Sequence, residues 1–202
     1  MKRVLYTFFL VLIATSVFAQ DFKGAKIYIN PGHGGHDSDD RYIPATGFWE
    51  SEGNLSKGLD LRDILQSYNA NVRMSRTLNR TEDDLGLSVI DADANSYDAD
   101  YFHAIHSNAW DAKSNYTLVL LRGFDSGPYN GDTTWAYSYK MGGYIWDNIN
   151  ATKTGAWSAT SKMVRGDISF YRSSTDAQVP YLGVLKTLTM PGTLSEGSFH
   201  AR

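Results

Sequence analysis

The chain has 202 residues, with 22 acidic side chains, 19 basic ones and no cysteine. This length predicts a single domain. The absence of cysteine excludes a disulfide framework, thiol catalysis and thiolate metal ligands. No basic cluster follows the first three residues, so nucleic acid is not an expected partner. Any metal ion must therefore be held by His, Asp or Glu.

The first twenty residues have the composition of an export signal. Lys2 and Arg3 precede an apolar run from 4 to 17, and the letters VFA then fit the small-residue pattern of a signal-peptidase site. We predict cleavage after Ala19, a single mature domain over 20–202 and a periplasmic or secreted location. The apolar run is too short to be read as a membrane-spanning helix. Cleavage would remove two of the 19 basic residues, which leaves 17 against 22 acidic ones and a formal charge of about −5.

Short apolar runs and helical patterns alternate along the rest of the chain. Strands are predicted at 25–30, 71–76, 101–108, 116–124 and 192–199. Helices are predicted from Asn54 onward, with Asn54 or Ser56 as the cap, then around 87–97 and over 133–148. The segment 151–180 has no clear pattern, and 181–188 is ambiguous between strand and helix. This alternation predicts an α/β domain with a mostly parallel, twisted sheet flanked by helices.

Four polar residues lie close to the ends of these elements. His33 comes just past the first strand, and His106 lies near the end of the strand at 101–108. Glu196 lies near the end of the last strand, and Glu50 precedes the first helix. In open α/β sheets the functional crevice lies outside the carboxyl ends of the strands. We therefore expect these side chains to meet at one edge of the sheet.

Two imidazoles and one carboxylate form a known catalytic zinc set, with a fourth position left for water or substrate. Zinc lowers the pKa of bound water to about 7 and polarises a carbonyl, which makes amide hydrolysis accessible at neutral pH. A second carboxylate that does not bind the metal is needed to move a proton to the leaving nitrogen. Glu196 is the candidate for that role.

Each of the four residues also has a structural explanation. His33 fits an exposed loop histidine, and His106 fits a core histidine bonded to the backbone. Glu50, with Glu52 beside it, fits a carboxylate that favours the start of a helix. Glu196 fits a solvated or capping side chain. The residues considered one by one leave both explanations open.

Other polar features carry weaker signals. His103 precedes His106 by three residues, so alternation places it on the opposite face of the strand, where we predict a structural role. The glycine-rich turn lacks the pattern of a phosphate-binding loop. Tyr, Trp and Gly gather over 128–157, which suits a flat polar ligand and a packed loop equally well. A calcium loop is not expected, because EF-hand spacing is missing from the residues His36, Asp37, Asp39 and Asp40.

Five segments, taken in order, resemble the zinc-dependent N-acetylmuramoyl-L-alanine amidases, the third type of cell-wall amidase. They are IYINPGHGGHD, ESEGNLSKGLDLRDIL, VRMSRT, ADANSYDADYFHAIHSNA and LGVLKTLTMPGTLSEGSF. The resemblance covers roughly residues 25 to 200 and is weakest over 125–180. It departs from the family pattern at Asn30, where Asp is usual. It also departs after the closing strand, where the family continues into a helix that we expect this domain to lack.

The resemblance implies that His33, Glu50 and His106 hold zinc and that Glu196 is the catalytic carboxylate. The register set by Asn54 and the leucine after it selects Glu50 rather than its neighbour two residues on. The implied substrate is peptidoglycan, cut between N-acetylmuramic acid and the L-alanine of the stem peptide. Nothing in the sequence suggests more than a monomer. Two alternatives stay open: a non-catalytic peptidoglycan-binding protein on this fold, and a zinc peptidase that cuts within the stem peptide.

Overall fold

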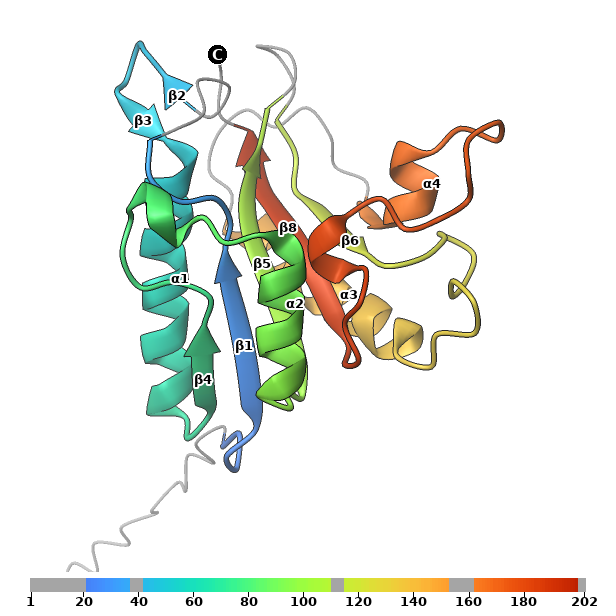
Figure 1. Ribbon diagram of the computed structural model, residues 1–202, viewed down its shortest axis with the longest axis horizontal. Helices are drawn as coiled ribbons and strands as arrows, with labels where there is room; N and C mark the ends of the chain where they lie inside the picture. Colours follow the sequence, from blue (N-terminus) through green and yellow to red (C-terminus); the bar gives the residue numbers. More distant parts are fainter. Residues whose placement is uncertain (1–20, 37–41, 110–114, 153–161, 200–202) are drawn as a thin grey trace, which may run out of the picture.

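A six-stranded sheet in the order β4-β1-β5-β8-β6-β7 forms the centre of the protein (Figure 1). The structure is a computed structural model that describes residues 21–36, 42–109, 115–152 and 162–199. The predicted signal segment lies outside these residues. The strands of the sheet are β1 (Lys26–Pro31), β4 (Asn71–Met74), β5 (Tyr101–Asn108), β6 (Leu118–Leu121), β7 (Val164–Gly166) and β8 (Gly192–Phe199).

The prediction of a mostly parallel sheet is confirmed. The strands β4, β1, β5 and β8 run parallel to one another. Strand β6 is antiparallel to β8, and β7 is parallel to β6. A separate hairpin, β2 (Tyr42–Ile43) and β3 (Phe48–Trp49), leads into the first helix. The parallel arrangement places the carboxyl ends of β1, β5 and β8 at the same end of the sheet, where that helix begins (Figure 1).

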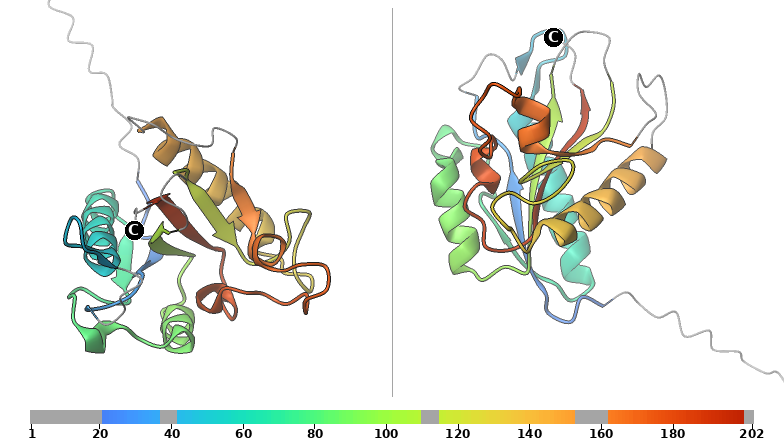
Figure 2. Two further views of the ribbon diagram at one scale, coloured as in Figure 1. Left: turned by 90° about the horizontal axis from the view of Figure 1, so that it is seen from above. Right: turned by 90° about the vertical axis from the view of Figure 1, so that its right-hand side faces the viewer.

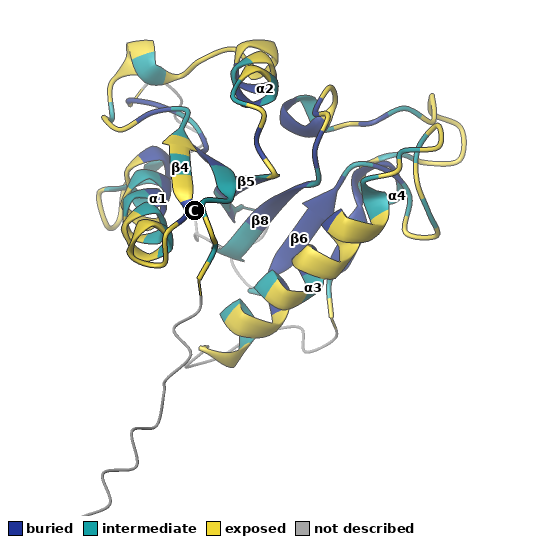
Figure 3. Cartoon of the chain, turned by 90° about the horizontal axis from the view of Figure 1, so that it is seen from below, coloured by how far each residue is buried: buried dark blue, intermediate teal, exposed yellow. Residues whose placement is uncertain are grey.

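Helices cover both faces of the sheet (Figure 2). The helices are α1 (Glu50–Ser67), α2 (Leu87–Ser96), α3 (Trp135–Ala151) and α4 (Asp167–Tyr171), with 3-10 turns η2 (Thr81–Asp83) and η3 (Gly183–Leu185). Helix α1 contacts β1, β4 and β5, whereas α3 contacts β6, β7 and β8. These two helices lie along one face, and α2 lies on the other (Figure 3). The helices turn exposed residues to solvent, whereas β6 between them is buried and the edge strand β4 is partly exposed (Figure 3).

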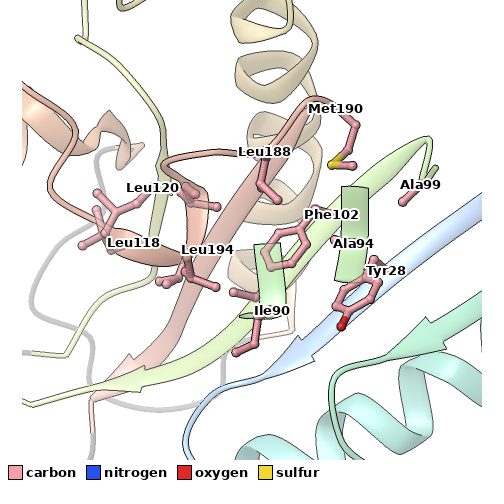
Figure 4. Packing of buried hydrophobic residues seen from close by; sticks show 13 residues of the cluster. Tyr28, Ile90, Ala94, Ala99, Phe102, Leu118, Leu120, Leu188, Met190 and Leu194 are labelled. Carbon is pink, nitrogen blue, oxygen red and sulfur yellow. The ribbon is translucent and has the colours of Figure 1, made fainter. Parts of the chain in front are cut away.

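The main hydrophobic core lies between the sheet and α2 (Figure 4). Phe102 of β5 and Tyr28 of β1 are both 0% exposed, and their rings stack with centroids 5.6 Å apart. Ile90 and Ala94 of α2 and Leu194 of β8 pack against the same core. A second cluster on the α3 side is built around Trp146. The core thus fixes β1, β5 and β8 against one another directly below the ends that carry the candidate site.

Replacement of Phe102 with Ala should lower the free energy of unfolding by about 3–5 kcal/mol, because it removes a fully buried aromatic ring and leaves a cavity. Urea unfolding followed by circular dichroism measures the loss. Tyr144→Ala is the matched control, because this tyrosine is 55% exposed on α3. Its effect should stay within about 0.5 kcal/mol of wild type. Equal losses in the two variants would contradict the core described here.

The structure differs from the sequence-based expectation at several elements. Helix α1 begins at Glu50, four residues before the predicted start, with extended Trp49 as its N-cap. The predicted cap at Asn54 or Ser56 is therefore wrong, because Asn54 is buried inside the helix. The unreadable segment 151–180 contributes β7 and α4, and 181–188 forms η3 within an irregular segment.

The remaining predicted elements are confirmed with shifts of a few residues at their ends. Strand β6 is shorter than the predicted run from 116 to 124. Within the described part of the chain, no helix combines the length and the apolar composition needed to cross a membrane.

Candidate metal centre

Three of the predicted site residues converge at the carboxyl ends of β1 and β5. His33 lies in the turn that follows β1, Glu50 opens α1, and His106 lies near the end of β5. Their nearest ligand atoms, two imidazole nitrogens and a carboxylate oxygen, all lie within 4.8 Å of one another. Residues separated by up to 73 positions in the sequence thus meet because parallel strands end at one edge.

The two imidazoles face the same carboxylate. His33 Nε2 lies 3.5 Å from Glu50 Oε2, and His106 Nδ1 lies 3.2 Å from Glu50 Oε1. The histidine rings meet edge to face, with centroids 4.8 Å apart. His33 has a positive φ of 63°, a conformation that is uncommon for a residue other than glycine. The turn after β1 therefore holds this imidazole in place with a strained backbone.

Glu50 is a buried carboxylate, 4% exposed, with its own support. The backbone N–H of Ser107 donates to Glu50 Oε1 over 2.9 Å, and Asn54 Nδ2 donates to the same oxygen over 3.1 Å. Burial raises the pKa of Glu50, but the hydrogen bond to His106, the nearby imidazole charges and the Ser107 N–H outweigh it and bring the pKa to about 2. Glu50 is thus ionised at neutral pH, as a metal ligand must be.

The donor set fits a divalent cation. Two imidazoles and one carboxylate match a catalytic zinc site with one open position. A buried carboxylate is stable only when it is paired or coordinates a metal. Among the described residues, His33, Glu50 and His106 form a group that could hold a metal ion. The geometry supports a metal centre without identifying the ion.

Glu196 lies beside this group on β8. It is in register with His106 across the β5–β8 pair, so both side chains point to the same face of the sheet. Glu196 Oε2 is buried and makes no hydrogen bond to the described residues. Burial raises the pKa of Glu196 to about 7, with the charge of Glu50 adding to the rise and those of His106 and Lys57 opposing it. Glu196 is therefore placed next to the cluster without belonging to it.

Two cavities border the cluster. A cavity of about 460 Å³ on the α2 side touches both His33 and His106, and its walls include Asp84, Leu182 and Leu194. This volume lies in the usual range for ligand sites. A larger cavity of about 720 Å³ between α1 and α3 reaches His106 but not His33, and its walls are mostly apolar. The smaller cavity is the better space for a polar substrate, because both histidines line it.

Gly32 allows β1 and β5 to bring their histidines together. A Cβ at this position would lie 2.2 Å from atoms of the His106 ring. Gly32→Ala should therefore displace this ring, weaken metal binding and lower the free energy of unfolding by about 1–3 kcal/mol. A chelator competition assay and urea unfolding measure the two effects. Gly127→Ala is the control, since a Cβ there meets nothing within 4 Å, and an equal effect in both variants would contradict the close approach.

The other polar candidates lie apart from the cluster. His36 Nε2 is 2.7 Å from Glu52 Oε1, and the His36 ring stacks on Trp49. Glu52 therefore faces away from the candidate centre, in agreement with the choice of Glu50. His103 is buried, with Nδ1 2.9 Å from Thr193 Oγ1, which agrees with a structural role. Asp37, Asp39 and Asp40 lie outside the described residues.

The sequence did not reveal the two groups that donate hydrogen bonds to the Glu50 carboxylate. The sequence predicts Asn54 or Ser56 as a helix cap, yet the side chain of Asn54 bridges Glu50 and the carbonyl of Gly32, 3.3 Å away. The available signal was spacing, because residues four apart on a helix lie on the same face. Nothing in the sequence pointed to the Ser107 N–H.

A largely parallel α/β sheet with two imidazoles and a carboxylate at its carboxyl edge is an arrangement that could hold a metal ion and fits the class of hydrolases that use one. Residues 27–201 match the family described as N-acetylmuramoyl-L-alanine amidase, and the chain belongs to this family. The match confirms the resemblance noted from the five sequence segments.

Individual proteins are similar to parts or to most of the chain. N-acetylmuramoyl-L-alanine amidase CwlM of Bacillus licheniformis is 41% identical over 86 residues, which are 42% of this chain and 32% of CwlM. The amidase AmiC2 of Nostoc punctiforme superposes with a TM-score of 0.63 and 21% identity, over 87% of this chain and 79% of AmiC2. Ami1 of Mycobacterium smegmatis gives a TM-score of 0.67 and 18% identity, over 89% and 84% of the two chains. The two structural matches show a shared fold.

Proposed function

We propose that this protein hydrolyses the amide bond between N-acetylmuramic acid and L-alanine in peptidoglycan, with zinc as its cofactor. The observation that carries the proposal is the cluster of His33, Glu50 and His106, with Glu196 in register beside it, in a chain of the amidase family. CwlM, AmiC2 and Ami1 are all described as N-acetylmuramoyl-L-alanine amidases.

The three clustered residues would hold the ion through two nitrogens and one oxygen. A zinc ion held there supplies Lewis-acid polarisation of the amide carbonyl and lowers the pKa of a water molecule to about 7. Asn54 and the Ser107 N–H keep the Glu50 carboxylate oriented toward both imidazoles. Orientation of a ligand by such hydrogen bonds supports metal affinity.

Glu196 is the proposed catalytic carboxylate. Its buried Oε2 makes no hydrogen bond to the described residues, so this oxygen keeps its capacity to accept a proton. In the proposed reaction Glu196 accepts a proton from the attacking water and passes it to the amide nitrogen as the bond to carbon breaks. The products are a muramic acid carboxylate and a stem peptide with a free amino group on L-alanine.

The cellular setting follows from the substrate. Peptidoglycan lies outside the cytoplasmic membrane, so the enzyme must be exported, and the sequence of residues 1–19 has the pattern of a signal peptide. We propose that residues 20–202 form the exported catalytic domain. We also propose that it acts as a monomer, since the site as proposed needs no residue from a second copy.

The test is the mass of the released products. Purified residues 20–202, loaded with zinc, are incubated with purified peptidoglycan, and the soluble fraction is analysed by mass spectrometry. The amidase releases intact stem peptides that begin with L-alanine. Release of shorter fragments would identify a peptidase that cuts within the stem. Binding to the cell wall without release would identify a non-catalytic binding protein.

A further inference from the structure

Arg76 is a buried arginine that contacts both segments carrying the candidate ligands. It follows β4 in the chain and is 5% exposed. A guanidinium has five N–H donors in a rigid plane, and Arg76 makes five hydrogen bonds. Four of the acceptors are backbone carbonyls and the fifth is an amide side chain. None of these five acceptors is a carboxylate, so Arg76 acts here as a hydrogen-bonding frame, with the charges of Asp84 and Asp83 nearby.

Three of the five bonds join the segments of His33 and Glu50. Nε donates to Pro31 O over 2.9 Å, and Nη2 donates to Gly32 O over 3.1 Å. These two carbonyls immediately precede His33. The same Nη2 donates to Ser51 O over 2.7 Å, one residue after Glu50. One guanidinium therefore sets the distance between the turn after β1 and the start of α1.

The other two hydrogen bonds link Arg76, through Asn79, to the residues of the glycine turn that follow His33. Nη1 donates to Leu78 O and to Asn79 Oδ1, each over 3.1 Å. Asn79 Oδ1 also accepts the N–H of Gly35 over 3.2 Å. The backbones are in close contact here, since a Cβ at Gly34 would lie 2.6 Å from a backbone nitrogen of the following loop. Arg76 and Asn79 thus hold the glycine turn before and after His33.

This frame explains how His33 keeps its unusual backbone. A positive φ in a residue other than glycine persists only where the surrounding structure imposes it. The bonds to Pro31, Gly32 and Gly35 lie on both sides of His33 and impose its φ of 63°. Without them the turn would relax and carry the imidazole away from Glu50.

We propose that Arg76 is a positioning residue that sets the separation of His33 and Glu50 before the metal binds, and thereby sets metal affinity. The inference rests on the proposed role of these residues as ligands. A lysine cannot replace the arginine, because a single ammonium cannot reach acceptors that surround a planar guanidinium. The proposed role of Arg76 therefore depends on the planar shape of the guanidinium and not only on its positive charge.

The test compares metal affinity in Arg76→Lys and wild type. Zn²⁺ and Co²⁺ dissociation constants are measured by competition with a chromophoric chelator, and the visible spectrum of the Co²⁺ form reports ligand geometry. We expect both ions to bind about 10–100-fold more weakly, as for other residues that orient metal ligands, with an altered Co²⁺ spectrum. Wild-type affinity and spectrum in a folded Arg76→Lys protein would overturn the proposal.

Arg122→Lys is the matched control. Arg122 also clamps backbone carbonyls, those of Leu185, Lys186 and Leu188, and it pairs with Asp132 over 2.7 Å. None of these partners carries a candidate ligand. We expect Arg122→Lys to unfold at lower urea concentration with metal affinity unchanged within twofold. An equal loss of metal affinity in both variants would show that Arg76 acts through general stability and would overturn the proposal.

A milder change keeps the test informative if Arg76→Lys fails to fold. Asn79→Ala removes the acceptor shared by Arg76 and Gly35, and we expect a smaller but measurable loss of Co²⁺ affinity. Unchanged affinity in Asn79→Ala would then overturn the proposal.

These readouts need no substrate, so a protein that binds zinc but releases no stem peptide would refute the amidase activity and leave the role of Arg76 intact. A wild-type protein that binds neither ion would overturn the inference together with the metal centre.

Discussion

Replacement of Glu196 with Gln should lower the release of stem peptides by about 10²–10⁴-fold, the usual contribution of a positioned general base or acid. Glutamine keeps the size and shape of the side chain but cannot take a proton from water. Because Glu196 lies outside the cluster of His33, Glu50 and His106, the zinc content should stay at one ion per chain. Elemental analysis and mass spectrometry of digests measure the two quantities on the same sample.

Glu52→Gln is the control for this change. Glu52 is half-exposed and lies 2.7 Å from His36, so its replacement removes a carboxylate near the site without touching the proposed machinery. Its activity should equal that of wild type. If Glu196→Gln retained full activity, the proton would have to travel by another group. If it lost zinc instead, Glu196 would be a ligand and not the catalytic carboxylate.

The positions of the candidate ligands His33 and His106 could be predicted because they depend on strand direction. His33 and His106 come at the ends of two short apolar runs, and the alternation of strands and helices indicated a parallel sheet. These two features of the sequence are enough to predict that both histidines lie at one edge of the sheet. The family resemblance then selected Glu50, whose neighbour Glu52 has the same chemistry and nearly the same place in the sequence.

The hydrogen bonds that hold the candidate ligands in place could not be predicted in the same way. Asn54 looks like a helix cap in the sequence, and only the early start of α1 puts it one turn after Glu50. Arg76 lies at the end of the predicted strand 71–76, and four of its five acceptors are backbone carbonyls, which no sequence pattern reveals. The reversal of β6 against β8 is likewise decided by tertiary packing.

The second large effect concerns the metal itself. The double variant His33→Ala, His106→Ala should lose its zinc, because two of the three proposed ligands are removed and only Glu50 remains. Loss of a residue that merely orients a ligand costs about 10–100-fold in affinity, so loss of two ligands should exceed 100-fold. Elemental analysis after gel filtration is expected to give one zinc per chain in wild type and none in the variant.

His36→Ala separates loss of a ligand from loss of any nearby histidine. His36 follows His33 by three residues, but its ring stacks on Trp49 and its Nε2 faces Glu52. This variant should keep one zinc per chain and full activity. If His36→Ala lost the ion while the double variant kept it, His36 would be a metal ligand and His33 and His106 would not. If wild type and all variants were free of zinc but still bound cell wall, a non-catalytic peptidoglycan-binding protein would explain the fold better than an amidase.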